Sequence, residues 1–380
     1  MKTKQLARLI VCALFATWMT GASPTAWASE KHELTWGICG HPSNNQPLWS
    51  DQAAQFATLE LRGFKTYRFD IPLTSHTPEA ITMLQKMVDL AKEHHVTLHP
   101  ILYVPFTWSD PTDGGKYPET DAGLEAQGYD RVYPVALQFA GSIHDWELQN
   151  ELTLRKSFKS GAGLSKDDYA TPVAKQWAAV LRGMSRAIHD AGAKTGEPLR
   201  TVVNTVYADF GFVPFLESQG VKVDKLAYHY YYGADTDPYK VSVSSGTVDL
   251  FAELKKIGKP IIVNEFNAGE IYSPTRSMPY DDAKALVGLK RHIDYLREQT
   301  EANIEGVEFY ELYDEPSKRG VESNFGLMKD PGHPKTQMLL AAAYTCGELG
   351  KDERAKLVAS GLFTEKSLAT RLATCHAGNP

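Results

Sequence analysis

The sequence contains only four cysteines and no Cys-x-x-Cys pair. This scarcity argues against a zinc centre or a thiol-redox site. Three cysteines lie beyond the N-terminal segment. In an oxidising compartment Cys346 and Cys375 could form a disulfide near the C-terminus, leaving Cys39 as a buried thiol at the end of the first strand. Spacing alone does not decide this pairing.

The sequence also lacks a basic tract. Its formal net charge is −6, and removal of residues 1–28, which hold three basic and no acidic side chains, changes it to −6 − 3 = −9. Nucleic acids and anionic membrane surfaces attract proteins through clustered Lys and Arg side chains. We therefore expect neither as a partner.

The N-terminus has no apolar run long enough to span a bilayer comfortably. Lys2, Lys4 and Arg8 precede the apolar stretch Leu9–Met19, and Ala26-Trp27-Ala28 follows it with small residues. This order predicts a secretory signal peptide, residues 1–28, that is removed after Ala28. A membrane anchor is the alternative, which the short run disfavours. The mature chain is expected to be periplasmic or secreted, without stable membrane insertion.

Short apolar runs alternate with stretches of helical periodicity along residues 29–350. Apolar residues recur every three or four positions between the runs, as in Trp177, Val180, Leu181 and Met184, and Asp190-Ala191-Gly192 marks a helix end before the fifth run. The eight predicted strands are Thr35–Gly40, Thr66–Ile71, Thr97–Val104, Ile143–Asn150, Arg200–Val206, Lys225–Tyr230, Pro260–Asn264 and Gly306–Tyr310.

This alternation predicts the α/β class, because parallel strands require helical crossovers. Eight repeats predict a closed (β/α)8 TIM barrel, with residues 351–380 as a C-terminal helical tail packed on it. No glycine-rich phosphate loop follows the first strand, which disfavours an open, doubly wound sheet.

Two Asn-Glu pairs, Asn150-Glu151 and Asn264-Glu265, close the fourth and seventh apolar runs. Active sites of such barrels lie at the C-terminal ends of the strands. Two carboxylates from opposite parts of the barrel, 265 − 151 = 114 residues apart, would meet there. Paired carboxylates are the catalytic groups of glycoside hydrolysis.

Further candidate residues lie at neighbouring strand ends. Arg68, on the second strand, is the best cation to face Glu265, and Tyr231, after the sixth strand, could donate its hydroxyl to Glu265. The long connection 105–130 carries Trp108, a candidate sugar contact on a loop of unusual length.

The pattern resembles clan A of the glycoside hydrolases, which are retaining (β/α)8 enzymes. Within the clan it is most similar to family 39-like and family 5-like enzymes of the kind found in bacterial exopolysaccharide gene clusters. Many members have a Trp at the end of strand eight, where this chain has Tyr310 or Tyr313. The residues that carry the resemblance are Asn150-Glu151, Glu265, Arg68, His229-x-Tyr231, Phe309–Pro316 and Asn324–Leu327.

The resemblance implies a double-displacement mechanism. Glu265 would be the nucleophile, Glu151 the acid/base, and Asn150 the partner of the sugar 2-hydroxyl, with Arg68, His229, Tyr231, Trp108 and Tyr310 completing the substrate site. Endo-action on a bacterial exopolysaccharide, no cofactor or metal, and a monomeric chain are expected. Glu311 and Glu315 could bind a charged or amino sugar, or form ordinary salt bridges.

Two alternatives stay open. A non-catalytic polysaccharide-binding protein could use the same barrel, although the four residues Glu151, Glu265, Arg68 and Tyr231 would then have no reason to be present together. A metal-dependent barrel hydrolase is disfavoured, because such barrels usually begin with His-x-His on strand one and this chain has Cys39-Gly40-His41.

Overall fold

The computed structural model describes residues 34–44, 46–73, 77–105, 117, 120–269, 271, 281–299 and 302–377. The predicted signal peptide and Trp108 lie outside these residues.

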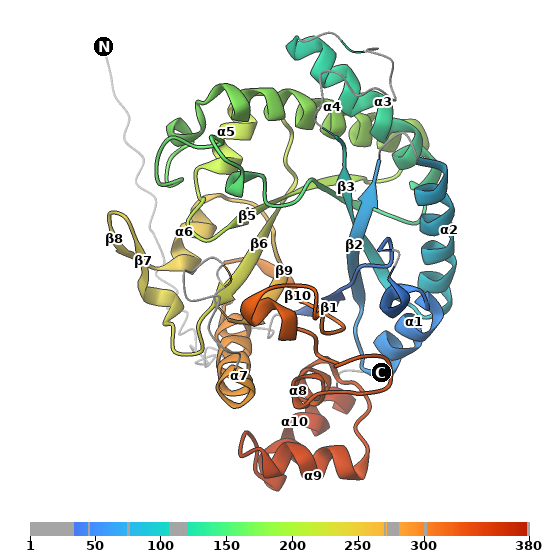
Figure 1. Ribbon diagram of the computed structural model, residues 1–380, viewed down its shortest axis with the longest axis vertical. Coiled ribbons are helices and arrows are strands. Elements are labelled where there is room, and N and C mark those ends of the chain that lie inside the picture. The colour runs from blue at the N-terminus through green and yellow to red at the C-terminus, as the bar shows by residue number, and fades with distance from the viewer. Residues whose placement is uncertain are drawn as a thin grey trace, which may run out of the picture. The chain divides into compact units, whose positions relative to one another are not determined.

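Eight parallel strands close into a barrel in the order β1-β10-β9-β6-β5-β4-β3-β2. The predicted (β/α)8 fold is therefore confirmed. In Figure 1 the barrel is seen with its helices arranged around the ring of strands. The barrel strands are β1 (Thr35–Cys39), β2 (Thr66–Pro72), β3 (Thr97–Tyr103), β4 (Asp145–Leu148), β5 (Arg200–Val206), β6 (Lys225–Tyr232), β9 (Ile261–Ala268) and β10 (Ile304–Phe309).

Helices such as α4 cover the outside of the barrel with an apolar face, whereas α8 is buried on all sides. The predicted stripe on α4 is confirmed, since Val180, Leu181 and Met184 are fully buried. Burial of such faces against the sheet is the main stabilising contribution in this architecture. The helices of the barrel are α1 (Gln52–Leu61), α2 (Thr77–Glu93), α3 (Asp121–Phe139), α4 (Pro172–Thr195), α5 (Phe212–Ser218), α6 (Leu250–Lys256), α7 (Asp282–Glu298) and α8 (Thr336–Thr345).

Several predicted boundaries were wrong. The helix expected to end near Gly192 continues to Thr195, where Gly196 adopts the left-handed conformation (φ 82°) that commonly terminates helices. Strand β6 extends to Tyr232 and β9 to Ala268, so Tyr231 and Glu265 lie within strands rather than after them. Strand β4 ends early, at Leu148, which places Glu151 in the following loop.

An unpredicted hairpin, β7 (Val241–Val243) with β8 (Gly246–Val248), lies between β6 and α6. The tail forms helices α9 (Lys351–Ala359) and α10 (Glu365–Ala377). A disulfide joins Cys346, at the end of α8, to Cys375 in α10. Across the described part of the chain, none of the helices combines the length and apolarity needed to cross a membrane.

Candidate active site

Arg68 is the centre of a polar network inside the barrel. It lies on β2, and its guanidinium donates two hydrogen bonds to the Glu147 carboxylate on β4, with Nε–Oε2 and Nη2–Oε1 distances of 2.6 and 2.9 Å. Both side chains are almost completely buried, at 2% and 3% exposure. A buried charge of this kind is tolerated only when it is paired and hydrogen-bonded.

Glu147 receives two further hydrogen bonds. Asn204 Nδ2 on β5 donates to Oε1 at 2.7 Å, and Asn264 Nδ2 on β9 donates to Oε2 at 2.8 Å. Each carboxylate oxygen thus accepts one bond from the guanidinium and one from an amide, which compensates the buried charge. The sequence interpretation missed Glu147. A signal was present, because Asp145 and Glu147 alternate with Trp146 and Leu148 at the two-residue period of a strand.

Glu265 lies on β9, where its carboxylate accepts from two donors. Arg68 Nη1 is 2.6 Å from Oε1, and the Tyr231 hydroxyl is 2.6 Å from Oε2. These contacts compensate the carboxylate charge and hold it in one orientation. The contacts of Arg68 and Tyr231 with Glu265 that the sequence predicted are therefore present in the structure.

A local irregularity in β9 allows Asn264 and Glu265 to face the same interior. Between Val263 and Phe266, the two residues Asn264 and Glu265 of β9 oppose the single residue Glu308 of β10. The register of β9 against β6 also shifts by one residue. Consecutive residues of a regular strand point to opposite faces, and an extra residue of this kind re-aims one of them. Such bulges are common beside active sites.

Glu151 follows β4 in a left-handed backbone conformation (φ 48°, ψ 40°). Left-handed non-glycine residues are uncommon and often occur at functional sites. The Glu151 backbone N–H donates to Asn204 Oδ1 at 2.8 Å, which holds the turn. The side chain is 22% exposed, so this carboxylate, unlike Glu265, reaches the opening of the barrel.

His229 lies between the two carboxylates. Its Nδ1 is 2.9 Å from Glu151 Oε1 and 3.2 Å from Glu265 Oε2. Arg68 Nη2 is 3.5 Å from Nε2, and a guanidinium can only donate, so Nε2 accepts and Nδ1 carries a proton in this arrangement. A carboxylate oxygen of Glu151, a carboxylate oxygen of Glu265 and a ring nitrogen of His229 all lie within 4.8 Å of one another.

Asn150 joins the same network, because its Oδ1 accepts from Arg68 Nη2 at 2.9 Å. This bond orients the amide and identifies its nitrogen as the group that could donate to a ligand. Cys39 is buried, as expected; its thiol donates to the Asn264 carbonyl at 3.1 Å, and burial raises the pKa of this thiol well above its usual range.

Tyr310 follows β10 and packs beside the Glu265 site. Its ring meets the Tyr231 ring edge-on at a centroid distance of 5.9 Å. Lys318 contacts the Tyr310 hydroxyl, and the ammonium lies 4.5 Å from the ring centroid. The aromatic ring expected at the end of strand eight is thus next to the nucleophile candidate, although its hydroxyl is engaged by a charged partner.

Glu311 is fully buried and belongs to a cluster of ion pairs. His41 Nε2 lies 3.1 Å from Glu311 Oε2, and Lys318 Nζ lies 3.3 Å from Oε1. Lys318 also pairs with Glu315, which accepts from the Trp49 indole at 3.1 Å. Of the two roles considered for Glu311 and Glu315, these contacts favour the salt bridges.

The cluster has clear electrostatic consequences. Burial by itself would lower the pKa of His41, but hydrogen bonds to Asp70 and Glu311 outweigh it and raise this pKa to about 10. Burial raises the pKa of the Glu311 carboxyl. Burial likewise opposes the charge on Lys318, yet Glu311 and Glu315 raise its pKa above the usual lysine range.

Two groups of side chains, among the residues that the structure describes, have the composition and spacing of a metal site: Glu151 with His229 and Glu265, and His41 with Glu311 and Glu315. In the first group Arg68 already contacts the Glu265 carboxylate. In the second group Lys318 contacts both Glu311 and Glu315.

Comparison with known proteins supports the fold. No protein-family model and no curated protein matches this sequence. Solved structures do match: a family 1 β-glucosidase from Thermotoga maritima has a TM-score of 0.57 at 13% identity, covering 84% of this chain and 99% of its own. A glucosidase from Croceicoccus marinus has a TM-score of 0.56 at 12% identity, covering 83% and 67%. At these identities the likeness shows a shared barrel architecture.

Proposed function

We propose that this protein is a retaining glycoside hydrolase. The observation that carries the proposal is the convergence of Glu151 and Glu265, whose carboxylate oxygens approach within 4.8 Å. Retaining enzymes hold their two carboxyl groups about 5–5.5 Å apart, whereas inverting enzymes separate them by about 6.5–9.5 Å to admit a water molecule. A non-catalytic binding protein would have no need of the short separation.

Glu265 is the nucleophile in this proposal. The reaction requires an ionised carboxylate, and Arg68 and Tyr231 compensate its charge from two sides. One Glu265 oxygen attacks the anomeric carbon, the bond from that carbon to the leaving oxygen breaks, and a covalent glycosyl-enzyme forms.

Glu151 is the acid/base. It gives its proton to the leaving oxygen in the first step and takes a proton from the attacking water in the second, when the glycosyl–Glu265 bond breaks. Its partial exposure suits a group that meets both the leaving group and water. His229 Nδ1–H can hydrogen-bond either carboxylate as the negative charge moves between them.

The substrate is proposed to be a bacterial exopolysaccharide cleaved within the chain, after export of the protein to the periplasm or the medium. The resemblance to family 39-like and family 5-like enzymes supports the polymer, and the N-terminal pattern of Lys2, Lys4 and Arg8 before an apolar run supports export. The structural neighbours are named as glucosidases, which makes an aryl β-glucoside the first simple substrate to test.

The decisive test separates the two carboxylates by chemical rescue. Glu265→Gly and Glu151→Gly should each lower kcat on an activated aryl glycoside by several orders of magnitude, measured with and without azide. Azide should restore turnover in both. With Glu265→Gly the glycosyl azide should have inverted anomeric configuration, because azide replaces the nucleophile, whereas with Glu151→Gly the configuration should be retained.

Glu253→Gly, at a partly exposed position of α6, is the matched control and should keep wild-type turnover. Sugar binding by calorimetry without any turnover by the wild type would support the binding-protein alternative instead. Size-exclusion analysis of polymer fragments decides between endo-action, which shortens the chains quickly, and release from the ends.

A further inference from the structure

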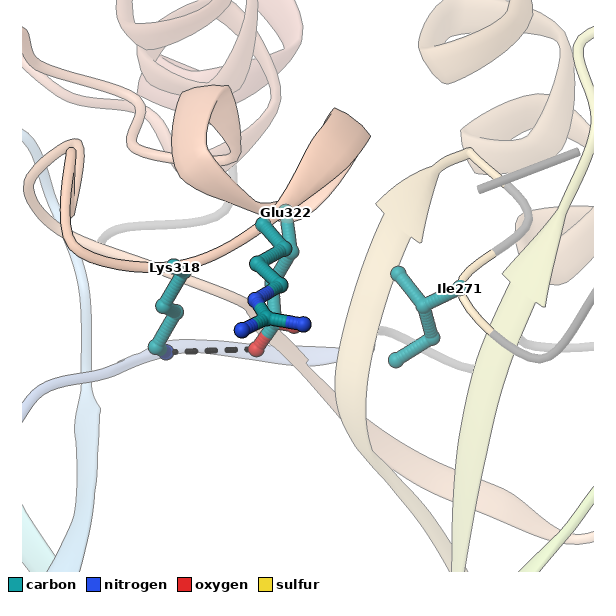
Figure 2. Close-up of a pocket in the computed structure, with 4 residues that line it drawn as sticks. Ile271, Lys318 and Glu322 are labelled. Carbon is teal, nitrogen blue, oxygen red and sulfur yellow. Dashed lines mark ion pairs between the residues drawn. The ribbon is translucent and has the colours of Figure 1, made fainter. Parts of the chain in front are cut away.

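A cavity of about 230 Å³ lies between the segments that follow β9 and β10 and has no assigned role. It is lined by Ile271, Lys318, Arg319 and Glu322. Figure 2 shows Ile271, on the segment after β9, across from Glu322, which lies in a short 3-10 helix (Gly320–Asn324) after β10, while Lys318 points toward the Glu322 carboxylate. The volume is below the range of about 300–1,000 Å³ typical of pockets for drug-sized ligands, which limits the occupant to about one sugar ring.

Two aromatic rings, those of Tyr310 and Tyr231, connect the cavity to Glu265. Lys318 contacts Tyr310, whose ring packs against Tyr231, and the Tyr231 hydroxyl is bound to the Glu265 carboxylate. Ile271 packs against the same group of rings. An occupant of the cavity would therefore lie across these two rings from a sugar bound over Glu265.

Barrel topology places the cavity on the side of the retained sugar. Strand β10 is four positions from β4 in the eight-stranded order, whichever way the barrel is followed, so the two strands lie opposite each other. Glu151 follows β4 and would protonate the leaving group. The loop after β10 is thus on the far side, where the sugar units that stay bound to Glu265 extend.

The charges that reach the cavity differ from those that the sequence suggested. Glu311 and Glu315 are buried and engaged by His41 and Lys318.

The cavity wall itself carries one acid and two bases. Glu322 is engaged by Lys318 and by the Tyr310 hydroxyl, each at 3.4 Å. Arg319 is exposed and, within the described residues, has no ion pair or hydrogen bond of its side chain. Its guanidinium is therefore available to pair with a charged group of a ligand. The two parallel N–H donors of a guanidinium fit the two oxygens of a carboxylate.

We propose that this cavity binds a carboxylate-bearing sugar unit on the retained side of the cleavage point, with Arg319 as its ionic partner. The inference rests on the proposed hydrolase function and specifies its substrate class as an acidic polysaccharide. Ile271 supplies an apolar edge for the sugar ring, and Glu322 an acceptor for a hydroxyl.

The test compares an acidic exopolysaccharide rich in glucuronic acid with the same polymer after chemical reduction of its carboxylates to alcohols. The measured quantity is the ratio of kcat/KM on the two polymers. Arg319→Gln should lower this ratio about tenfold or more, because a hydrogen bond between charged groups is lost. Arg319→Lys keeps the positive charge, so its ratio should stay close to that of the wild type. Lys329→Gln removes one charge from the same chain segment outside the cavity wall and should leave the ratio unchanged.

A wild-type enzyme that cleaves both polymers equally well, or an Arg319→Gln variant with an unaltered ratio, would overturn the acidic-sugar assignment while leaving the hydrolase proposal intact. If no glycoside is cleaved, the hydrolase proposal fails and calorimetry still tests the cavity. Methyl β-glucuronide should then bind the wild type more tightly than it binds Arg319→Gln, and equal affinities would remove the site.

Discussion

Arg68 and Glu147 form a bidentate ion pair inside the barrel, and the same guanidinium also contacts Glu265. Glu147 therefore acts on the candidate nucleophile through Arg68: it fixes the plane of the guanidinium and so the direction of the Nη1–H that reaches Glu265. The two amide donors Asn204 and Asn264 hold Glu147 in turn. The site is thus supported by a buried network that spans β2, β4, β5 and β9.

Loss of Glu147 should destabilise the protein strongly. Glu147→Gln leaves Arg68 without half of its charge compensation, and breaking a buried pair in this way costs about 3–5 kcal/mol. The free energy of unfolding, measured by guanidinium denaturation, should fall accordingly. Glu253→Gln is the matched control, because its pair with Lys256 on the surface of α6 should contribute below about 1 kcal/mol. Equal losses in the two variants would contradict the role given to Glu147.

Removal of the Tyr231 hydroxyl should slow the reaction without unfolding the protein. Tyr231→Phe deletes one donor to Glu265, and a hydrogen bond to a charged group contributes about 1.5–3 kcal/mol, so kcat should fall about 10- to 100-fold. Steady-state kinetics on an aryl glycoside measure the effect. Tyr232→Phe removes the neighbouring hydroxyl, which bonds Tyr228 instead, and should change kcat by less than a few-fold. A similar loss in both would point to packing rather than to the donor.

The stability of the His41 cluster should depend on pH in the alkaline range. The pKa of His41 is raised from an ordinary value of 6.5 to about 10, so its charge stabilises the fold fully below about pH 6.5 and this contribution disappears as pH rises toward 10. Unfolding free energies at pH 6, 8 and 9.5 should fall more steeply for the wild type than for His41→Gln.

His144→Gln provides the control for that experiment, because the His144 side chain is 41% exposed and lies outside the cluster. Its pH profile should follow that of the wild type. Parallel profiles for the wild type and His41→Gln would show that the cluster does not stabilise the fold through His41.

The disulfide between Cys346 and Cys375 should stabilise the C-terminal helices. It closes a segment with a sequence separation of 29 residues, and the loss of chain entropy in the unfolded state then predicts about 3–4 kcal/mol. Cys375→Ser, or reduction with dithiothreitol, should lower the melting temperature. The double variant Cys346→Ser with Cys375→Ser should no longer respond to dithiothreitol; a continued response would show that the effect does not come from this disulfide.

The order of strands and helices, and the polar residues at strand ends, could be read from the sequence because both depend on local periodicity. All eight barrel strands were predicted, and Glu151, Glu265, Arg68, His229, Tyr231 and Asn150 lie together in the structure. The catalytic and binding roles given to them stay predictions, as does the role of Trp108, which lies outside the described residues.

The sequence by itself determined the strand–helix alternation, and with it the closed barrel and the general location of the site. Only the tertiary structure decided which side chains meet. Glu147 is separated along the chain by 79 residues from Arg68 and by 117 residues from Asn264. These side chains meet because the register between strands and the extra residue in β9 turn them toward one another. Local periodicity contains no information about that register, since it is set by how the whole sheet twists and closes.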